Sequence, residues 1–131
     1  MMEPLINLDT IRGAAAWEAR EDAFWMTAPD LDVVGMAQQM LQSEARLMTM
    51  TGAASADGET DIYYHYALDK QSYHICVPTR GKKIASITPV TPAASWIERE
   101  INDLYVVEFE GHPGLARLLR PQQLAAGFFR R

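Results

Sequence analysis

The clearest pattern in the chain is a strict alternation of apolar and polar residues along two neighbouring segments. Apolar side chains stand at every second position in both segments: Ile62, Tyr64, Tyr66 and Leu68 in the first, and Tyr73, Ile75 and Val77 in the second. Because successive side chains of a β-strand point to opposite faces, this alternation predicts two half-buried strands joined as a hairpin. The apolar faces align only if the loop holds two or four residues. We expect Leu68 opposite Tyr73 and Tyr66 opposite Ile75.

Upstream of the hairpin, residues 31–44 carry apolar residues at helical spacing. The spacing predicts an amphipathic helix with Asp30 as its N-cap. The residues expected on its buried side are Val34, Ala37 and Leu41, with Val33 and Met40 beside them.

The other segments complete a picture of interleaved helices and strands. Residues 45–54 and 84–90 are typical of strands, and Asp57-Gly58 predicts a turn. A second helix is expected to start at Pro92 or Ser95 and to end near Tyr105. Antiparallel neighbours combined with helices predict an α+β fold, a two-layer sandwich with helices packed on one face of a mixed, mostly antiparallel sheet.

Three segments are expected: an N-terminal extension over residues 1–30, a main domain over 31–121 and a C-terminal tail over 122–131. Apolar residues in the extension indicate a possible helix, with Asp9 as its cap: Leu8, Ile11, Ala15, Phe24 and Trp25. Gly13 weakens that prediction by about 1 kcal/mol relative to Ala.

Composition narrows the classes of function. The chain has 131 residues, which fits one domain, and a net charge of −5, which argues against bulk nucleic-acid binding. Its single cysteine, Cys76, cannot hold an iron–sulfur cluster or a cysteine-rich zinc site, and no nucleotide fingerprint occurs. The chain carries no recognisable cofactor motif. The apolar runs are too short to span a bilayer and no secretion signal is visible, so we expect a cytoplasmic protein.

Charged and aromatic residues are densest over residues 96–105. On a helical wheel, one side is expected to be buried: Ile97, Ile101, Leu104 and Tyr105. One flank gathers a polar and aromatic patch of Trp96, Arg99, Glu100 and Asp103, and the other flank holds Glu98 and Asn102.

Three interpretations of that patch remain open. It is a solvated flank with an Arg99–Asp103 pair, or a docking surface, since Trp and Arg commonly anchor interfaces. The third interpretation is an acid–base pair of Glu100 and Asp103, although nothing else in the chain supplies a nucleophile or an oxyanion site.

The hairpin offers a second candidate site. The expected register places His65, His74 and Cys76 on the face opposite the tyrosines, with His65 across from Cys76. Such ligands suit zinc or nickel, but no fourth ligand is evident, and the alternative is an ordinary sheet face with hydrogen-bonded histidines. His112 is expected to brace a turn.

The patch helix and the bend after it resemble the signature of the 30 kDa subunit of respiratory complex I, also called the C subunit of bacterial NADH–quinone oxidoreductase. The matching positions are Glu98, Arg99, Glu100, Asp103, Tyr105, Phe109, Gly111, His112 and Pro113. The resemblance covers about residues 31–121. It departs at Val106, Gly114 and Ala116, and a Val in place of the family's Gly predicts a different loop after the helix.

The resemblance implies a non-catalytic, cofactor-free subunit of a membrane-associated oxidoreductase complex. The complex would be an NADH–quinone oxidoreductase or an energy-converting nickel–iron hydrogenase, and the short chain and divergent motif favour the hydrogenase. The implied partner is the large catalytic subunit, and the implied location is cytoplasmic, peripheral to the inner face of the cell membrane. The residues expected to dock are Trp96, Arg99, Glu100, Asp103, Gly111, His112 and Pro113. The alternative is a stand-alone metal-binding or carboxylate-dependent enzyme.

Overall fold

The computed structural model describes residues 3–21 and 23–114. Seven strands and two helices follow one another along these residues: β1 (Glu18–Arg20), β2 (Ala23–Thr27), α1 (Val33–Gln42), β3 (Arg46–Ala54), β4 (Thr60–Leu68), β5 (Gln71–Pro78), β6 (Lys83–Ala85), α2 (Ala94–Tyr105) and β7 (Glu108–Glu110). The predicted tail, 122–131, lies outside the described residues.

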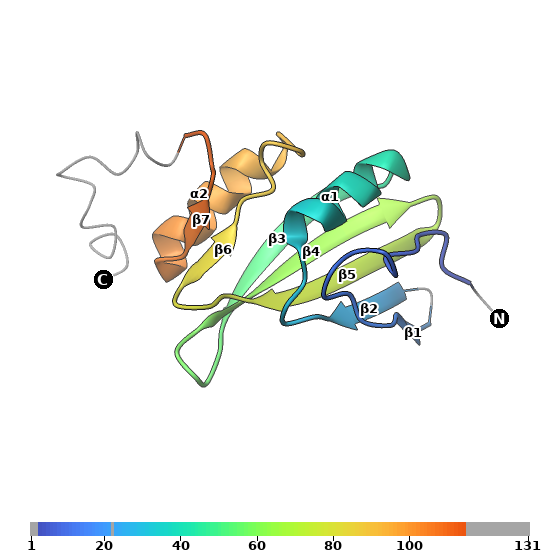
Figure 1. Ribbon diagram of the computed structural model, residues 1–131, viewed down its shortest axis with the longest axis horizontal. Helices are drawn as coiled ribbons and strands as arrows, with labels where there is room; N and C mark the ends of the chain where they lie inside the picture. The colour runs from blue at the N-terminus through green and yellow to red at the C-terminus, as the bar shows by residue number, and fades with distance from the viewer. Residues whose placement is uncertain (1–2, 22, 115–131) are drawn as a thin grey trace.

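Five of the strands form one sheet in the order β1-β2-β5-β4-β3. Its pairs are antiparallel except β2 with β5, which run parallel, and β6 and β7 form a separate parallel pair. Both helices lie on the same side of the five-stranded sheet (Figure 1). The predicted α+β sandwich with a mixed, mostly antiparallel sheet is confirmed.

The core lies between the sheet and the helices. The alternating positions of β4 and β5 fill it with large side chains that are at most 1% exposed: Ile62, Tyr64, Tyr66, Tyr73 and Ile75. Helix α1 covers them with Val33, Met36, Ala37 and Met40. The alternation in the sequence therefore identified the buried face of the sheet correctly.

Helix α1 is shorter than predicted. Its N-cap is Asp32, whose carboxylate accepts a hydrogen bond from the Gly35 N–H at 3.1 Å. The predicted cap, Asp30, is wrong, because that carboxylate pairs with Arg80 instead. The predicted burial of Leu41 is also wrong, since this side chain is 62% exposed at the end of the helix.

The hairpin joins the predicted strands in a different register. Only Asp69 and Lys70 connect them, and Tyr66 pairs with Tyr73, so the expected pairing of Tyr66 with Ile75 is wrong by two residues. The apolar faces still align, because the observed loop of two residues and the expected loop of four both contain an even number of residues. Asp69 has φ +53°, a conformation that Asp tolerates and that two-residue hairpin turns require.

The helix suggested for residues 1–30 is wrong. Strands β1 and β2 form there, and β2 adds to the sheet beside β5, with Phe24 and Met26 buried and Trp25 on the other face. The period-two pattern of these few residues was too short to outweigh the helical spacing in the sequence. Tertiary pairing with β5 decides the outcome.

The strand predicted over residues 84–90 is wrong after Ala85. Only Lys83–Ala85 is extended, paired with β7. The chain then leaves the strand because residues 86–88 turn their polar groups toward helix α2.

Candidate functional site

Helix α2 is rotated relative to the predicted wheel. Its buried residues are Ala94, Glu98, Ile101 and Asn102, whereas Leu104, predicted to be inside, is 59% exposed. Two polar residues thus take places that apolar ones were expected to fill. Such burial is tolerated only where the polar groups find partners.

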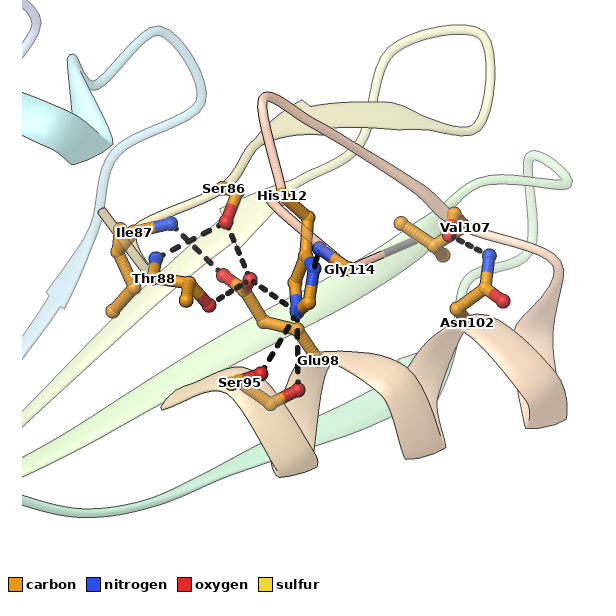
Figure 2. Close-up of polar contacts among 9 residues, drawn as sticks. All are labelled: Ser86, Ile87, Thr88, Ser95, Glu98, Asn102, Val107, His112 and Gly114. Carbon is orange, nitrogen blue, oxygen red and sulfur yellow. Dashed lines mark hydrogen bonds and ion pairs between the residues drawn. The ribbon is translucent and has the colours of Figure 1, made fainter. Parts of the chain in front are cut away.

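Glu98 is completely buried and fully engaged by one loop. Its carboxylate accepts hydrogen bonds from the Ser86 hydroxyl at 2.6 Å, the Ile87 N–H at 2.9 Å and the Thr88 hydroxyl at 2.8 Å (Figure 2). The Ser86 hydroxyl oxygen also accepts the Thr88 N–H at 3.1 Å. The carboxylate therefore fastens the loop after β6 to the helix, which starts at Ala94 with Ala93 as its N-cap and has no side-chain cap.

Burial raises the pKa of the Glu98 carboxyl above its ordinary value. The three donors and the nearby His112 favour the ionised form and oppose this shift, but removal from water outweighs them. Glu98 therefore holds its proton more tightly in the folded chain than in the unfolded one.

His112 is buried beside this cluster, and its ring is fixed at both nitrogens. Nδ1 accepts the Gly114 N–H at 2.9 Å, while Nε2 lies 3.2 Å from the Ser95 carbonyl oxygen and 3.9 Å from Glu98 Oε1 (Figure 2). A backbone amide on Nδ1 leaves the ring proton on Nε2, where it faces Ser95. A nucleophile relay needs serine and carboxylate on opposite ring nitrogens, so this arrangement braces a bend and does not activate Ser95.

Asn102 ties the end of the helix to the next segment. Its side-chain amide donates to the Val107 carbonyl oxygen at 2.8 Å (Figure 2). Between them Val106 caps the helix in the left-handed region, with φ +58°. The loop was expected to differ where Val replaces Gly, yet Val106 adopts the positive φ itself.

The opposite side of α2 is open to solvent. Trp96 is 64% exposed and the Arg99 guanidinium lies 5.2 Å from its ring centroid, within cation–π range. Glu100 and Asp103 are exposed on the same side, and Leu104 adjoins them. We call Trp96, Arg99, Glu100, Asp103 and Leu104 the α2 patch.

The bend after β7 is split between surface and interior. Gly111 and Pro113 are exposed, whereas the His112 side chain is 1% exposed. The expectation that His112 braces a turn agrees with this placement, and any contact with a partner would come from its neighbours. A docking role for these residues stays a prediction.

The acid–base interpretation of Glu100 and Asp103 gains no support from their placement. Both carboxylates project into solvent, where water screens them and leaves no enclosed site in which to orient a substrate.

The hairpin register also changes the His/Cys candidate. His65 lies opposite His74, and Cys76 lies opposite Tyr63, so the predicted His65–Cys76 pairing is wrong. Within the described residues no group of three or more His, Cys, Asp or Glu side chains could hold a metal ion. The three-ligand zinc or nickel site considered as one alternative is therefore not formed by these residues.

Sequence reasoning missed the polar cluster around Glu98. The signal was present, because Glu98 and Asn102 stand one helical turn apart on the same side of the wheel. Ser86 and Thr88 alternate with apolar residues just before the helix. A polar stripe of this kind, facing polar residues of a neighbouring segment, is consistent with a buried network as well as with a solvated flank.

Comparison with known proteins adds a family match. The family model described as the respiratory-chain NADH dehydrogenase 30 kDa subunit matches residues 27–128. The C subunit of the NADH-quinone oxidoreductase of Mesorhizobium japonicum is 45% identical over 62 residues, which cover 45% of this chain and 31% of that protein.

Two further relatives extend the comparison. The C subunit of the same oxidoreductase from Caulobacter sp. is 28% identical over 106 residues, covering 69% of this chain and 50% of that protein. The C/D subunit of Methylococcus capsulatus is 36% identical over 69 residues, covering 50% of this chain and 12% of that protein. The chain thus spans at most half the length of these relatives.

Solved structures share the fold. One belongs to the membrane-bound sulfane sulfur reductase, an archaeal respiratory membrane complex, with a TM-score of 0.67 at 22% identity, over 82% of this chain and 68% of that one. Another is the trypsin-resistant fragment of Nqo5, with a TM-score of 0.59 at 18% identity, over 78% of this chain and 89% of that one.

Proposed function

This chain belongs to the family of the respiratory-chain NADH dehydrogenase 30 kDa subunit, and we propose that it is a non-catalytic, cofactor-free subunit of a membrane-associated oxidoreductase complex. Within that complex it docks on the large catalytic subunit through the α2 patch and the exposed ends of the 111–113 bend. Electron transfer takes place in the partner subunits.

The α2 patch carries the proposal. Trp96 is exposed with the Arg99 guanidinium over its ring, and Trp and Arg are enriched among the residues that dominate the energetics of interfaces. Glu98 anchors the other side of the same helix through three buried hydrogen bonds. The patch therefore stands on a rigid support, which lowers the entropy lost on docking.

The choice of partner has support from the relatives. The Methylococcus capsulatus protein is named as a combined C/D subunit, and this chain resembles only a small share of it. A single polypeptide that joins a part like this chain to a D-type part implies that the two parts are held close together. We therefore propose the D type of subunit as the partner, in an NADH–quinone oxidoreductase or a related energy-converting hydrogenase.

Association with the membrane is proposed to be indirect. No helix among the residues described, 3–21 and 23–114, is long and apolar enough to cross a bilayer. We place the subunit at the cytoplasmic side of the membrane, held there by other subunits of the complex.

Co-purification tests the docking role. The large subunit is co-expressed with the tagged chain carrying Trp96→Ala, and with a control carrying Leu41→Ala, which removes a similarly exposed apolar side chain from the other helix. We expect Trp96→Ala to reduce recovery of the large subunit severalfold, and Leu41→Ala to leave it unchanged. Equal recovery with both variants would refute docking through the α2 patch.

A further inference from the structure

The sheet carries a row of rings on the face turned away from its buried tyrosines. Trp25 of β2 stacks on His74 of β5, with ring centroids 4.4 Å apart. His74 meets His65 of β4 edge-on at 4.9 Å, and Tyr63 lies parallel to His65 at 6.2 Å. The proposed docking role uses none of these residues.

The two histidines point the same nitrogen at each other. His65 Nδ1 and His74 Nδ1 are 2.7 Å apart, across the directly paired positions of β4 and β5. We propose that this pair binds one divalent transition-metal ion, Cu²⁺ or Ni²⁺, between the two Nδ1 atoms. In the metal-free chain one Nδ1–H donates a hydrogen bond to the other Nδ1, and that ring must move its proton to Nε2 before both Nδ1 atoms can bind the ion.

The separation of the nitrogens selects the class of metal. Two bonds of about 2.0 Å at a right angle, as in square-planar or octahedral sites, place the nitrogens roughly 2.9 Å apart. A tetrahedral zinc site of the same bond length needs about 3.3 Å. The observed 2.7 Å is nearer to the right-angled arrangement, which Cu²⁺ and Ni²⁺ prefer. Because the two nitrogens point directly at each other in the metal-free chain, both rings must turn for their lone pairs to meet at the ion.

The far side of each ring is already held in place. His65 Nε2 lies 3.1 Å from the Thr51 hydroxyl, and His74 Nε2 lies 3.1 Å from the Ser72 hydroxyl. Both hydroxyl oxygens can accept a hydrogen bond from Nε2–H, and a neutral ring protonated at Nε2 keeps its lone pair on Nδ1 for the metal. Histidine ligands in metal sites are commonly oriented by such a partner on the other nitrogen.

The setting favours an open, exchangeable site. Both rings are half-buried, so an ion between them stays within reach of solvent. Two protein ligands leave further coordination positions to water. The affinity should follow the general order for nitrogen sites, with Cu²⁺ above Ni²⁺.

Copper titration of the untagged full chain tests this inference. The sequence has three histidines, and the third, His112, is buried with its Nδ1 occupied, so few sites compete. We expect one Cu²⁺ per chain, a paramagnetic resonance spectrum with two equivalent nitrogens, and quenching of Trp25 fluorescence. His65→Phe and His74→Phe keep an aromatic ring but should each weaken binding at least about tenfold.

Cys76→Ser is the matched control, because it changes a cysteine thiol that lies two residues from His74 on the same face of β5. It should leave the copper affinity unchanged. Loss of binding in Cys76→Ser, no binding by the wild-type chain, or wild-type affinity in both phenylalanine variants would each overturn the two-histidine site. The spectrum of the wild-type chain decides the matter even if a variant fails to fold.

Discussion

Glu98 is the residue on which the local structure of the site most depends. It accepts hydrogen bonds from two hydroxyls and one backbone N–H, and all of these groups are buried. Removing the carboxylate leaves each donor without its partner, and an unsatisfied buried donor costs about 1–3 kcal/mol.

We therefore expect Glu98→Ala to lower the free energy of unfolding by about 3 kcal/mol or more. Glu98→Gln retains one acceptor for the Ile87 N–H and should cost about 1 kcal/mol. Glu100→Ala, on the exposed side of the same helix, should change stability by less than about 0.5 kcal/mol. Urea unfolding at neutral pH compares the three, and equal losses at positions 98 and 100 would contradict the network.

Glu98 also predicts a pH dependence. Its folded pKa is raised above the ordinary value of 4.5, so the folded chain binds this proton more tightly than the unfolded chain. The stability contributed by Glu98 is then fully present below about pH 4.5 and is lost as the pH rises through the folded pKa. The difference in unfolding free energy between wild type and Glu98→Gln should shrink from pH 4.5 to pH 7, and growth of that difference would show that the pKa is lowered instead.

Val106 has a conformation that its side chain disfavours. A β-branched residue at φ +58° carries about 1–2 kcal/mol of strain, which glycine avoids. Because glycine also adds entropy to the unfolded chain, we expect Val106→Gly to stabilise the fold by about 0.5–1 kcal/mol net. Val106→Ala is the control, since Ala keeps the Cβ atom and gains little; thermal unfolding of both variants measures the difference.

At the scale of elements, the sequence predicted which segments form strands and helices more reliably than the residues at which these elements begin and end. Alternation along β4 and β5 was long enough to identify the buried face, because a one-residue slip would expose every apolar side chain. It could not distinguish a loop of two residues from one of four, since both keep the faces aligned. The rotation of α2 was ambiguous in the sequence, because the polar stripe of Glu98 and Asn102 fits a solvated flank as well as a buried network, and its partners lie in another segment.

The contact between α2 and β3 supplies a test at this scale. A Cβ atom added at Gly52 would lie 2.9 Å from Tyr105 Cε2 and 3.4 Å from Ile101 Cγ2. Gly52 is therefore required by close packing, and its φ is not in the left-handed region.

We expect Gly52→Val to lower stability by about 1–3 kcal/mol, because the larger side chain pushes α2 away from β3. Ala53→Val, on the other face of the same strand, should change stability by less than about 0.5 kcal/mol. Chemical denaturation compares the pair. A neutral Gly52→Val variant would mean that α2 does not pack closely on this strand.

At the scale of the whole molecule, the family could be recognised from the sequence, whereas the burial or exposure of the individual motif residues could not. Glu98, Arg99, Glu100 and Asp103 sit in one short motif, and the family model matches residues 27–128. The motif does not reveal that its first glutamate is buried while the next three charged residues face outward. Helix α2 therefore places one residue of the motif in the protein interior and leaves the others on a surface that a partner can reach.

Docking through the α2 patch is decided by the affinity of the purified chain for the large subunit. The variant combines Arg99→Ala, Glu100→Ala and Asp103→Ala, all on the exposed side of α2, and its unfolding temperature is checked first to show that the fold is intact. We expect the variant to lose about 2 kcal/mol or more of binding free energy, a rise in Kd of roughly 30-fold. An unchanged Kd in a correctly folded variant would contradict docking through this patch.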